Sequence, residues 1–443
     1  MTARHPDPVS TGGPPSADET SQGANAGTPT ATHAAALTGI RICDFSGQLA
    51  GAGATRFLGA MGAEVIRIED PVTHGYWDAL RGMAPFVDDR RGPDFGGPFN
   101  NHNVQKLGVT LNLRTDVGKR LLRELVARSD VVTENFAAGV LARLGFPYEE
   151  LQAIKEDVIY VSNSGFGHTG PYREFKTWGP LAQACSGLSL STGLPNCLPA
   201  GIGYSYMDHH GANFMAIAVL AGLMHHARTG RGQWIDISCT EAGALLNGPA
   251  LLDYSANGRP MRRSGSPHSN RSDHPSMAPH GIYATAGDDN WIAIACRHDD
   301  DWQSLAAIIA TPWAGDPRFA TLTGRLHDQE DLDRQLAEWT RTFDRYELAS
   351  RLQATGVPAA AVQRPAERID HDPGTSEWRL WPTVTHSKMG SVRVDGIPVH
   401  FSRTDWTIER AAPCLGEHNA LVFGGLLGYS DDELRAFHDE GVL

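Results

Sequence analysis

Residues 39–70, GIRICDFSGQLAGAGATRFLGAMGAEVIRIED, decide the fold class. An apolar run at residues 40–45 leads into a turn rich in glycine, and a segment with small and apolar residues at helical spacing follows it. A second apolar run occupies residues 64–68. This order predicts a strand, a helix and a parallel strand, which is the repeating unit of α/β folds.

The same alternation continues to about residue 239. Residues 116–130 have apolar side chains on one face of a predicted helix, and residues 214–226 form a long apolar helical run. Several of the predicted strands end in polar or glycine residues, and open α/β sheets bind ligands at such ends. These strands lie within KLGVTLNLRT (106–115), VVTENF (131–136), DVIYVSNSGFG (157–167) and WIDISC (234–239).

Composition divides the chain into a tail and two domains. We expect a disordered tail at residues 1–36, which are rich in Pro, Gly, Ser, Thr and Ala and contain almost no large apolar residues. Two further hairpins are predicted at residues 281–296 and 391–402, with a mostly helical stretch between about 300 and 355. The expected fold is α/β: a Rossmann-like large domain from residues 37–245 and 395–443, a linker at 246–276, and a smaller α+β domain with its return linker at 277–394.

Composition also excludes several classes of partner. The formal net charge of −13 argues against nucleic acid, because binding a phosphate backbone needs a basic surface. The longest apolar run, near residues 214–224, is too short to cross a bilayer, so no membrane contact is expected. The six cysteines are scattered without metal-binding spacing, which is typical of a reducing compartment. We therefore expect a cytoplasmic protein.

The glycine turn is by itself a weak functional signal. Gly47, Gly51 and Gly53 do not have the GxGxxG spacing of dinucleotide-binding folds, which disfavours nicotinamide binding. Small residues at these positions are equally consistent with close packing of the turn and the helix on the sheet.

Asp208 is the most informative acid in the chain, because it stands immediately before the long apolar helix in YSYMDHHGANF. With His209 and His210 it could form a metal site, but adjacent helical residues point in different directions and no further carboxylate cluster supports one. Asp208 could instead be the helix N-cap. The positive end of the helix would also keep its carboxylate ionised at neutral pH and able to attack an activated carbonyl. From the local sequence alone, cap and nucleophile both remain open.

Several motifs together resemble one family. GIRICDFSGQLAGAGATRFLGAMGAEVIRIE, KLGVTLNLRT, SDVVTENFAAGVLARLGF, VIYVSNSGFGHTGPY, AQACSGLSLSTG and TGRGQWIDIS occur in that order. They resemble motifs of the class III CoA-transferases, which include formyl-CoA transferase, carnitine CoA-transferase and the α-methylacyl-CoA racemases. The resemblance covers about residues 37–440.

The resemblance implies a reaction and an assembly. Asp208 falls on the family's nucleophile, so it would attack an acyl-CoA thioester to give an aspartyl anhydride and then an aspartyl-CoA thioester. Coenzyme A is part of the substrate, and neither a tightly bound cofactor nor a metal is expected. The implied partners are an acyl-CoA, a carboxylic acid and, in an interlocked homodimer, a second copy of the chain.

The family's CoA contacts transfer to positions that match its motifs. The resemblance implies pantetheine and diphosphate contacts from Asn135 and Arg143, an adenine slot lined by Val140 and Leu144, and phosphate contacts from Arg114 and Lys176. Arg suits phosphate oxygens because its planar group donates two hydrogen bonds side by side.

The chain also departs from the family at the expected substrate pocket. Trp178 and Gly179 stand where the transferases have a Tyr-Glu pair, and Gln48 stands one position before the family's pocket glutamine, which aligns with Leu49. Asp70 replaces a basic residue after the second strand. We therefore expect an acyl group larger than formyl or oxalyl.

A further departure is the missing glycine run that covers the active site of formyl-CoA transferase. NRSDHPSMAPHG, at residues 270–281, occupies its place. His280 is expected to contribute a polar group to the pocket from this segment, and His274 is a second candidate.

Two alternatives remain within the family. A supporting subunit of a heteromeric transferase would fit the loss of the Tyr-Glu pair and the glycine run, but not the presence of Asp208. An acyl-CoA racemase needs a His at the position of Trp178, and an indole cannot act as a base at neutral pH.

Overall fold

The computed structural model describes residues 35–194 and 196–443, and the tail predicted at residues 1–36 lies almost entirely outside them. In the described residues, six parallel strands form one sheet in the order β3-β2-β1-β4-β5-β6. The predicted α/β class and parallel sheet are therefore confirmed. The strands are β1 (Arg41–Asp44), β2 (Glu64–Glu69), β3 (Lys106–Thr110), β4 (Val131–Glu134), β5 (Ile159–Ser164) and β6 (Gln233–Ser238).

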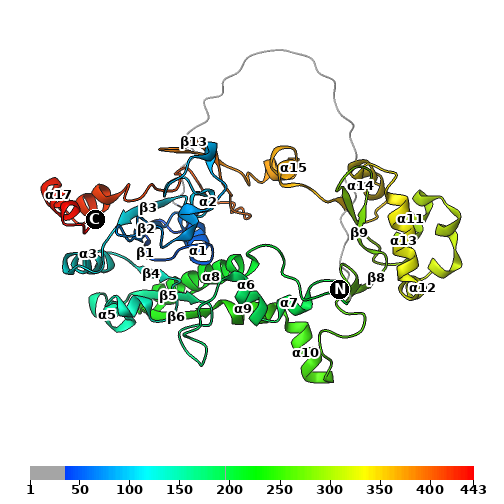
Figure 1. Cartoon of the computed structure of the whole chain (residues 1–443), viewed down its shortest axis with the longest axis horizontal. Coiled ribbons are helices and arrows are strands. Elements are labelled where there is room, and N and C mark those ends of the chain that lie inside the picture. Colours follow the sequence, from blue (N-terminus) through cyan, green and yellow to red (C-terminus); the bar gives the residue numbers. More distant parts are fainter. Residues whose placement is uncertain (1–34, 195) are drawn as a thin grey trace, which may run out of the picture. The chain divides into compact units, whose positions relative to one another are not determined.

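One face of the sheet packs against helices α1 (Ala50–Ala60) and α8 (Tyr206–Thr229), which also contact each other (Figure 1). Side chains alternate along each strand, so Ile42 joins the core on this face while Cys43 joins the core on the other. Gly222 allows α8 to lie close to β5, because an added Cβ there would be 2.9 Å from Ile159. The two helices most important for the site therefore share one buried surface.

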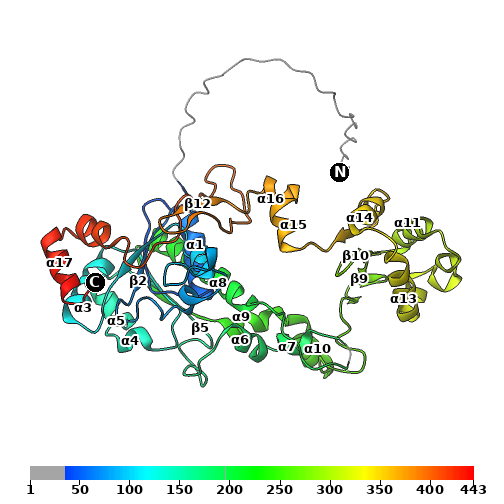
Figure 2. The ribbon, with the colours of Figure 1, turned by 45° about the horizontal axis from the view of Figure 1, so that its top comes forward.

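The opposite face packs against segments from both ends of the chain. Helices α3 (Asp116–Ala127) and α5 (Tyr148–Ile154) share a core with the π-helical turn η5 (Ala420–Leu426) and helix α17 (Asp431–Asp439). Figures 1 and 2 both show α17 beside α3, and the hydroxyl of Tyr429 donates a hydrogen bond to Glu124 over 2.9 Å. The C-terminal residues thus complete the core of the sheet.

The remaining helices before residue 260 are short. They are α2 (Gly97–His102), α4 (Val140–Arg143), α6 (Gly179–Cys185), α7 (Leu188–Ser191), α9 (Cys239–Leu246) and α10 (Gly248–Asn257), with 3₁₀ turns η1 (Ala79–Gly82) and η2 (Val87–Asp89).

A separate hydrophobic core contains buried residues between Ala278 and Val357. The predicted hairpin at residues 281–296 is present as β9 and β10, and β11 pairs with β10. The elements here are β7 (Ser272–Asp273), β8 (Ser276–Met277), β9 (His280–Ala284), β10 (Trp291–Ala295), α11 (Asp299–Ile309), η3 (Pro312–Gly315), η4 (Pro317–Phe319), α12 (Leu322–His327), α13 (Gln329–Thr340), α14 (Arg345–Gln353) and β11 (Ala359–Ala361).

The chain then returns through α15 (Pro365–Asp370), α16 (Pro373–Glu377), β12 (Thr383–His386) and β13 (Gly390–Arg393). The hairpin predicted at residues 391–402 is wrong, because β13 pairs with the preceding strand β12 across a turn that ends at Gly390. Val384 and Val394 pack with Ala60 of α1. The domain boundaries themselves stay a prediction.

Candidate active site

The glycine turn after β1 is held by the side chain of Asn135, the first residue after β4. Asn135 accepts a hydrogen bond from Gly47 N (2.7 Å) through Oδ1 and donates one to Gly47 O (3.0 Å) through Nδ2. A Cβ at position 47 would lie 2.6 Å from the ring of Trp77, so this position requires glycine. The next residue, Gln48, has φ +53°, in the left-handed region that side chains other than glycine rarely adopt.

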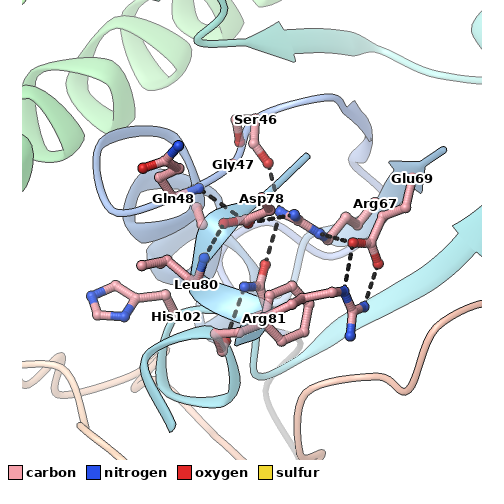
Figure 3. Close-up of polar contacts among 12 residues, drawn as sticks. Ser46, Gly47, Gln48, Arg67, Glu69, Asp78, Leu80, Arg81 and His102 are labelled. Carbon is pink, nitrogen blue, oxygen red and sulfur yellow. Dashed lines mark hydrogen bonds and ion pairs between the residues drawn. The ribbon is translucent and has the colours of Figure 1, made fainter. Parts of the chain in front are cut away.

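A cluster of buried ions lies directly behind this turn. It consists of Asp44, Arg67, Glu69, Asp78, Arg81 and Lys106, which we call the charge cluster, and each member is fully buried. Figure 3 shows how Arg67 connects the cluster to the turn: it donates to Ser46 O over 2.6 Å and to Asp78 Oδ2 over 2.7 Å. Asp78 Oδ2 also accepts a hydrogen bond from Gln48 N (3.1 Å). The cluster therefore fixes the backbone of the turn, including the left-handed residue.

Every acid of the cluster is near a cation. Arg81 forms two hydrogen bonds to Glu69, and Lys106 Nζ is 3.3 Å from Asp44 Oδ2. Burial alone would raise the pKa of Glu69, but Arg81 and Arg67 reverse the effect and hold that pKa below its ordinary value. The pKa of Asp44 is lowered in the same way by Lys106 and Arg67. Burial lowers the pKa of Lys106 to about 8, against the attraction of Asp44.

Asp208 is in the first turn of α8, whose N-cap is Ser205. The N-cap interpretation of Asp208 is therefore wrong. The carboxylate lies against the first residue of α6: a Cβ added to Gly179 would be 2.5 Å from Asp208 Oδ2. Only a residue without a side chain allows this approach.

The electrostatic surroundings of Asp208 differ from those of the charge cluster. Among the described residues no cation forms an ion pair with it. Burial raises the pKa of Asp208 to about 6, and the smaller effect of Ser205 opposes this shift. A carboxyl with this pKa is still about nine-tenths ionised at pH 7.

Asp208 lines a cavity that the turn and the strand ends enclose. Its walls come from the glycine turn, the loop after β4, the end of β5 and the segment before α6. Most of the predicted catalytic and pocket residues meet here. The lining residues include the predicted nucleophile Asp208, the predicted pocket residues Gln48, Trp178 and Gly179, and the predicted CoA contacts Asn135 and Lys176, together with Gly47, Ala50, Trp77, Phe136, Asn163, Ser164, Ala182 and Cys239.

Cys239 is a lining residue that the sequence interpretation missed. Its buried thiol is 3.2 Å from Asn163 Oδ1, and burial, with a smaller effect of Asp208, raises its pKa to about 12. The signal was present in the sequence, because Cys239 is the last residue of the predicted strand WIDISC (234–239) and directly follows the observed strand β6, at the sheet edge where ligands bind. A thiol with this pKa is protonated at neutral pH and is a poor nucleophile.

A second hollow continues from the first, since Trp77 and Phe136 line both. Val140, Leu144 and Arg114, three of the predicted CoA contacts, line this second hollow, which we call the slot. Its other lining residues are Phe45, Ile68, Glu69, Asp70, Leu111, Asn112 and Leu113. Val140 and Leu144, the two residues predicted to line the adenine site, therefore lie in one hollow, and Asp208 lines the other.

Three predicted residues have other surroundings than expected. The amide of Asn135 is occupied by Gly47, so its structural role is to hold the turn. Arg143 ends α4 on the surface, beside Val140 but outside the residues that line the slot. His280 begins β9 and contacts Asn270 O, and it lines a hollow formed by β9 and β10 instead of the Asp208 cavity. A ligand role for these three stays a prediction.

The histidines beside Asp208 have protein partners. His209 Nε2 is 2.8 Å from the hydroxyl of Tyr204, and His210 Nε2 is 3.2 Å from Ala242 O. Within residues 35–194 and 196–443, no group of three or more His, Cys, Asp and Glu side chains is placed to bind a metal ion. In the same residues, no helix has both the length and the apolar character needed to cross a membrane.

Comparisons with known proteins agree on one family. The model of CoA-transferase family III matches residues 37–419. The succinyl-CoA–D-citramalate CoA-transferase of Chloroflexus aurantiacus is 32% identical over 408 residues, which are 92% of this chain and 98% of that protein. The formyl-CoA:oxalate CoA-transferase of Streptomyces coelicolor is 32% identical over 428 residues, 93% of this chain and 100% of that protein.

A solved structure agrees with the sequence relatives. The crystal structure of a CAIB/BAIF family protein from Brucella suis matches with a TM-score of 0.78 and 31% identity, and the match covers 88% of this chain and 99% of that one.

Proposed function

The chain belongs to CoA-transferase family III and is an acyl-CoA:carboxylate CoA-transferase, and we propose that Asp208 carries its covalent chemistry. The observation that carries this proposal is the position of Asp208: an unpaired carboxylate, its pKa raised by burial, inside a cavity at the strand ends. A carboxylate that is still ionised at neutral pH, but poorly solvated, is a better nucleophile than one that is paired or fully hydrated.

The proposed reaction has four acyl transfers. The Asp208 carboxylate attacks the thioester carbonyl, and the CoA thiolate leaves, so that a mixed anhydride forms. The thiolate attacks the aspartyl carbonyl of this anhydride and releases the donor acid, which leaves an aspartyl-CoA thioester. The acceptor carboxylate attacks that thioester and again expels the thiolate, which finally attacks the acceptor's carbonyl and regenerates the Asp208 carboxylate. Each step expels a carboxylate or a thiolate, and no proton transfer is required.

The binding of CoA follows from the two connected hollows. In this proposal the thioester lies beside Asp208, the pantetheine arm passes Trp77 and Phe136, and the adenine ring enters the slot between Val140 and Leu144. Arg114 lies at the slot, while Lys176 lies in the Asp208 cavity. Both side chains are exposed; Arg114 is 3.3 Å from the carboxylate of Asp70, whereas Lys176 can reach an anionic group of the substrate.

We also propose that the acyl group is larger than formyl or oxalyl. The wall around Asp208 contains Ala50 and Ala182, whose small side chains leave room, and the exposed indole of Trp178 adds apolar surface at the cavity. The Chloroflexus relative is named for succinyl-CoA and D-citramalate, which fit this expectation, whereas the Streptomyces relative is named for formyl-CoA and oxalate.

A homodimer is part of the proposal. Helices α8 to α10 expose several large apolar side chains that an interface would bury, among them Ile217, Met224, Leu245, Leu251 and Leu252. Sedimentation at several protein concentrations would detect the dimer, and a monomer at all concentrations would contradict it.

The experiment that tests the function is a panel of acyl-CoA donors against carboxylic acids, with products measured by mass spectrometry. We expect transfer from succinyl-CoA to a dicarboxylic acid, slow transfer between formyl-CoA and oxalate, and a loss on the order of 10⁴-fold in Asp208→Ala. Asp116→Ala is the matched control, because Asp116 is also in the first turn of a helix but outside the cavity.

The outcomes separate the alternatives. Fast exchange with oxalate would contradict the size of the acyl group. Full activity of Asp208→Ala would contradict the nucleophile. Deuterium entering the α-carbon of a branched acyl-CoA without transfer would indicate a racemase, and no transfer from any donor would indicate a supporting subunit.

A further inference from the structure

Asp70 is the first residue after β2, and its carboxylate lies at the slot. Oδ1 accepts a hydrogen bond from Val72 N over 2.9 Å, which fixes the side chain. Oδ2 lies 3.3 Å from Nη2 of Arg114. The Asp70 side chain is 28% exposed and that of Arg114 is 62% exposed, so the pair faces the ligand side of the slot and solvent.

The charges around the slot nearly cancel. The ionisable residues that line it are Glu69, Asp70 and Arg114. Glu69 is fully buried and is neutralised by Arg81 and Arg67. Among the described residues that line the slot, the accessible charges are therefore one carboxylate and one guanidinium, and these two already contact each other. A phosphate dianion at this place would have to compete with Asp70 for Arg114 and would be repelled by it.

The position of Asp70 directly after the second strand of the sheet indicates which part of a nucleotide it can bind. In dinucleotide sites built on a strand–turn–helix–strand unit, an acid after the second strand accepts a hydrogen bond from a ribose hydroxyl, whereas sites for a ribose phosphate have an arginine nearby. Asp70 follows the second strand, 23 residues after Gly47 of the glycine turn. Its carboxylate can therefore accept a hydrogen bond from a hydroxyl, and its charge repels a phosphate.

We propose that Asp70 makes this slot a site for the ribose of adenosine, because its carboxylate accepts a hydrogen bond from a ribose hydroxyl group. The 3′-phosphate of CoA then adds little to the affinity. This inference rests on the proposed function and deepens it, because it assigns a specificity-determining residue to the nucleotide end of the substrate. The protein would accept CoA and 3′-dephospho-CoA almost equally, with Arg114 held by Asp70 in both complexes.

The test is calorimetric titration of the full chain with CoA and with 3′-dephospho-CoA. In the wild type we expect the two Kd values to agree within about threefold. Asp70→Asn keeps the size of the side chain and the oxygen that accepts from Val72, but removes the charge and frees Arg114. In this variant the Kd for CoA should fall by about 3- to 10-fold, while the Kd for 3′-dephospho-CoA should stay constant or rise.

Two further variants serve as controls. Asp88→Asn removes an exposed carboxylate that pairs with Arg90 outside the slot, and it should change neither Kd. Arg114→Gln, added to Asp70→Asn, should cancel the gain for CoA, because it removes the cation that the variant frees.

The outcomes distinguish this inference from the function on which it rests. A wild type that binds both nucleotides but prefers CoA by about 30-fold or more would overturn the role of Asp70 and leave the transferase mechanism intact. Equal shifts of both Kd values in Asp70→Asn would overturn it too. If neither nucleotide bound the wild type, the proposed function would fail, and this inference with it.

Discussion

The charge cluster and Asp208 are two ways of burying a carboxylate on the two sides of one turn. In the cluster every acid is close to an Arg or a Lys, and the pKa values of Asp44 and Glu69 lie below their ordinary range. Asp208 faces the backbone of Gly179 and a partly apolar wall, and its pKa is raised to about 6. Burial raises the pKa of all three acids, so the nearby cations explain why the pKa values of Asp44 and Glu69 are lowered and that of Asp208 is not.

The charge cluster therefore has a structural role, whereas Asp208 is the reactive group. The paired ions hold Ser46, Gln48 and the turn in one geometry, since breaking a pair would leave a buried charge with less compensation. The unpaired Asp208 is reactive but lowers the stability of the folded protein, a trade-off that is common at active sites. Three predictions compare the two regions directly, and they run from the largest effect to the smallest.

The largest effect on stability is expected for a substitution in the charge cluster. Glu69→Gln keeps the shape of the side chain but leaves Arg81 and Arg67 without their shared anion, so it should lower the free energy of unfolding by about 3–5 kcal/mol. Chemical denaturation monitored by circular dichroism measures this change.

The matched control is Glu64→Gln, at the other end of β2. Glu64 pairs with Arg41, but 45% of its side chain is exposed, so the loss should be at most about 1 kcal/mol. Equal losses in the two variants would mean that the buried pairs do not stabilise the turn.

The second effect is on the pH dependence of catalysis. Because the pKa of Asp208 is raised to about 6, kcat/KM should fall about tenfold per pH unit below pH 6, as the nucleophile becomes protonated. The Cys239 thiol has its pKa raised to about 12 and does not titrate in this range. An acid limb centred near pH 4, in enzyme shown to remain folded, would contradict the raised pKa.

The smallest effect is a gain in stability when Asp208 is neutralised. The folded-state pKa is higher than the ordinary value of 3.8, so the folded state binds the proton more tightly and loses stability as pH rises from about 4 to 6. Asp208→Asn should therefore be more stable than the wild type above pH 6, by about 1–2 kcal/mol after allowance for partial exposure, and should lose this advantage near pH 4. Thermal unfolding at pH 8 and pH 4 measures both values, and a variant less stable than the wild type at pH 8 would contradict the account.

The sequence alone allowed the sheet and much of the site to be predicted, because those features depend on local patterns. Apolar periodicity located β1 and β2, and the resemblance to a family placed Trp178, Gly179 and Asp208 in one pocket. The contacts that hold the turn could not be predicted in this way. Asn135 and Gly47 are 88 positions apart, and nothing in the sequence near either residue indicates that they meet.

Two errors have physical reasons of the same kind. The N-cap interpretation of Asp208 was wrong because the helix begins three residues earlier, after Ser205, where the preceding YSY sequence gives no clear apolar signal. The hairpin predicted at residues 391–402 was wrong because residues 383–386, and not the residues that follow, pair with the strand at 390–393. Gly390, which has a positive φ, ends the short turn between these two strands. Competition between neighbouring segments is decided by tertiary packing, here against Ala60.

The most direct test of the account is to trap the aspartyl-CoA thioester during turnover. Protein incubated with the best acyl-CoA donor is quenched with hydroxylamine, which converts an aspartyl thioester or anhydride into a hydroxamate, and is then digested for peptide mass spectrometry. The account predicts a hydroxamate on Asp208 that depends on the donor and is absent in Asp208→Asn. Steady turnover with an unmodified Asp208, or with the label on another residue, would contradict it.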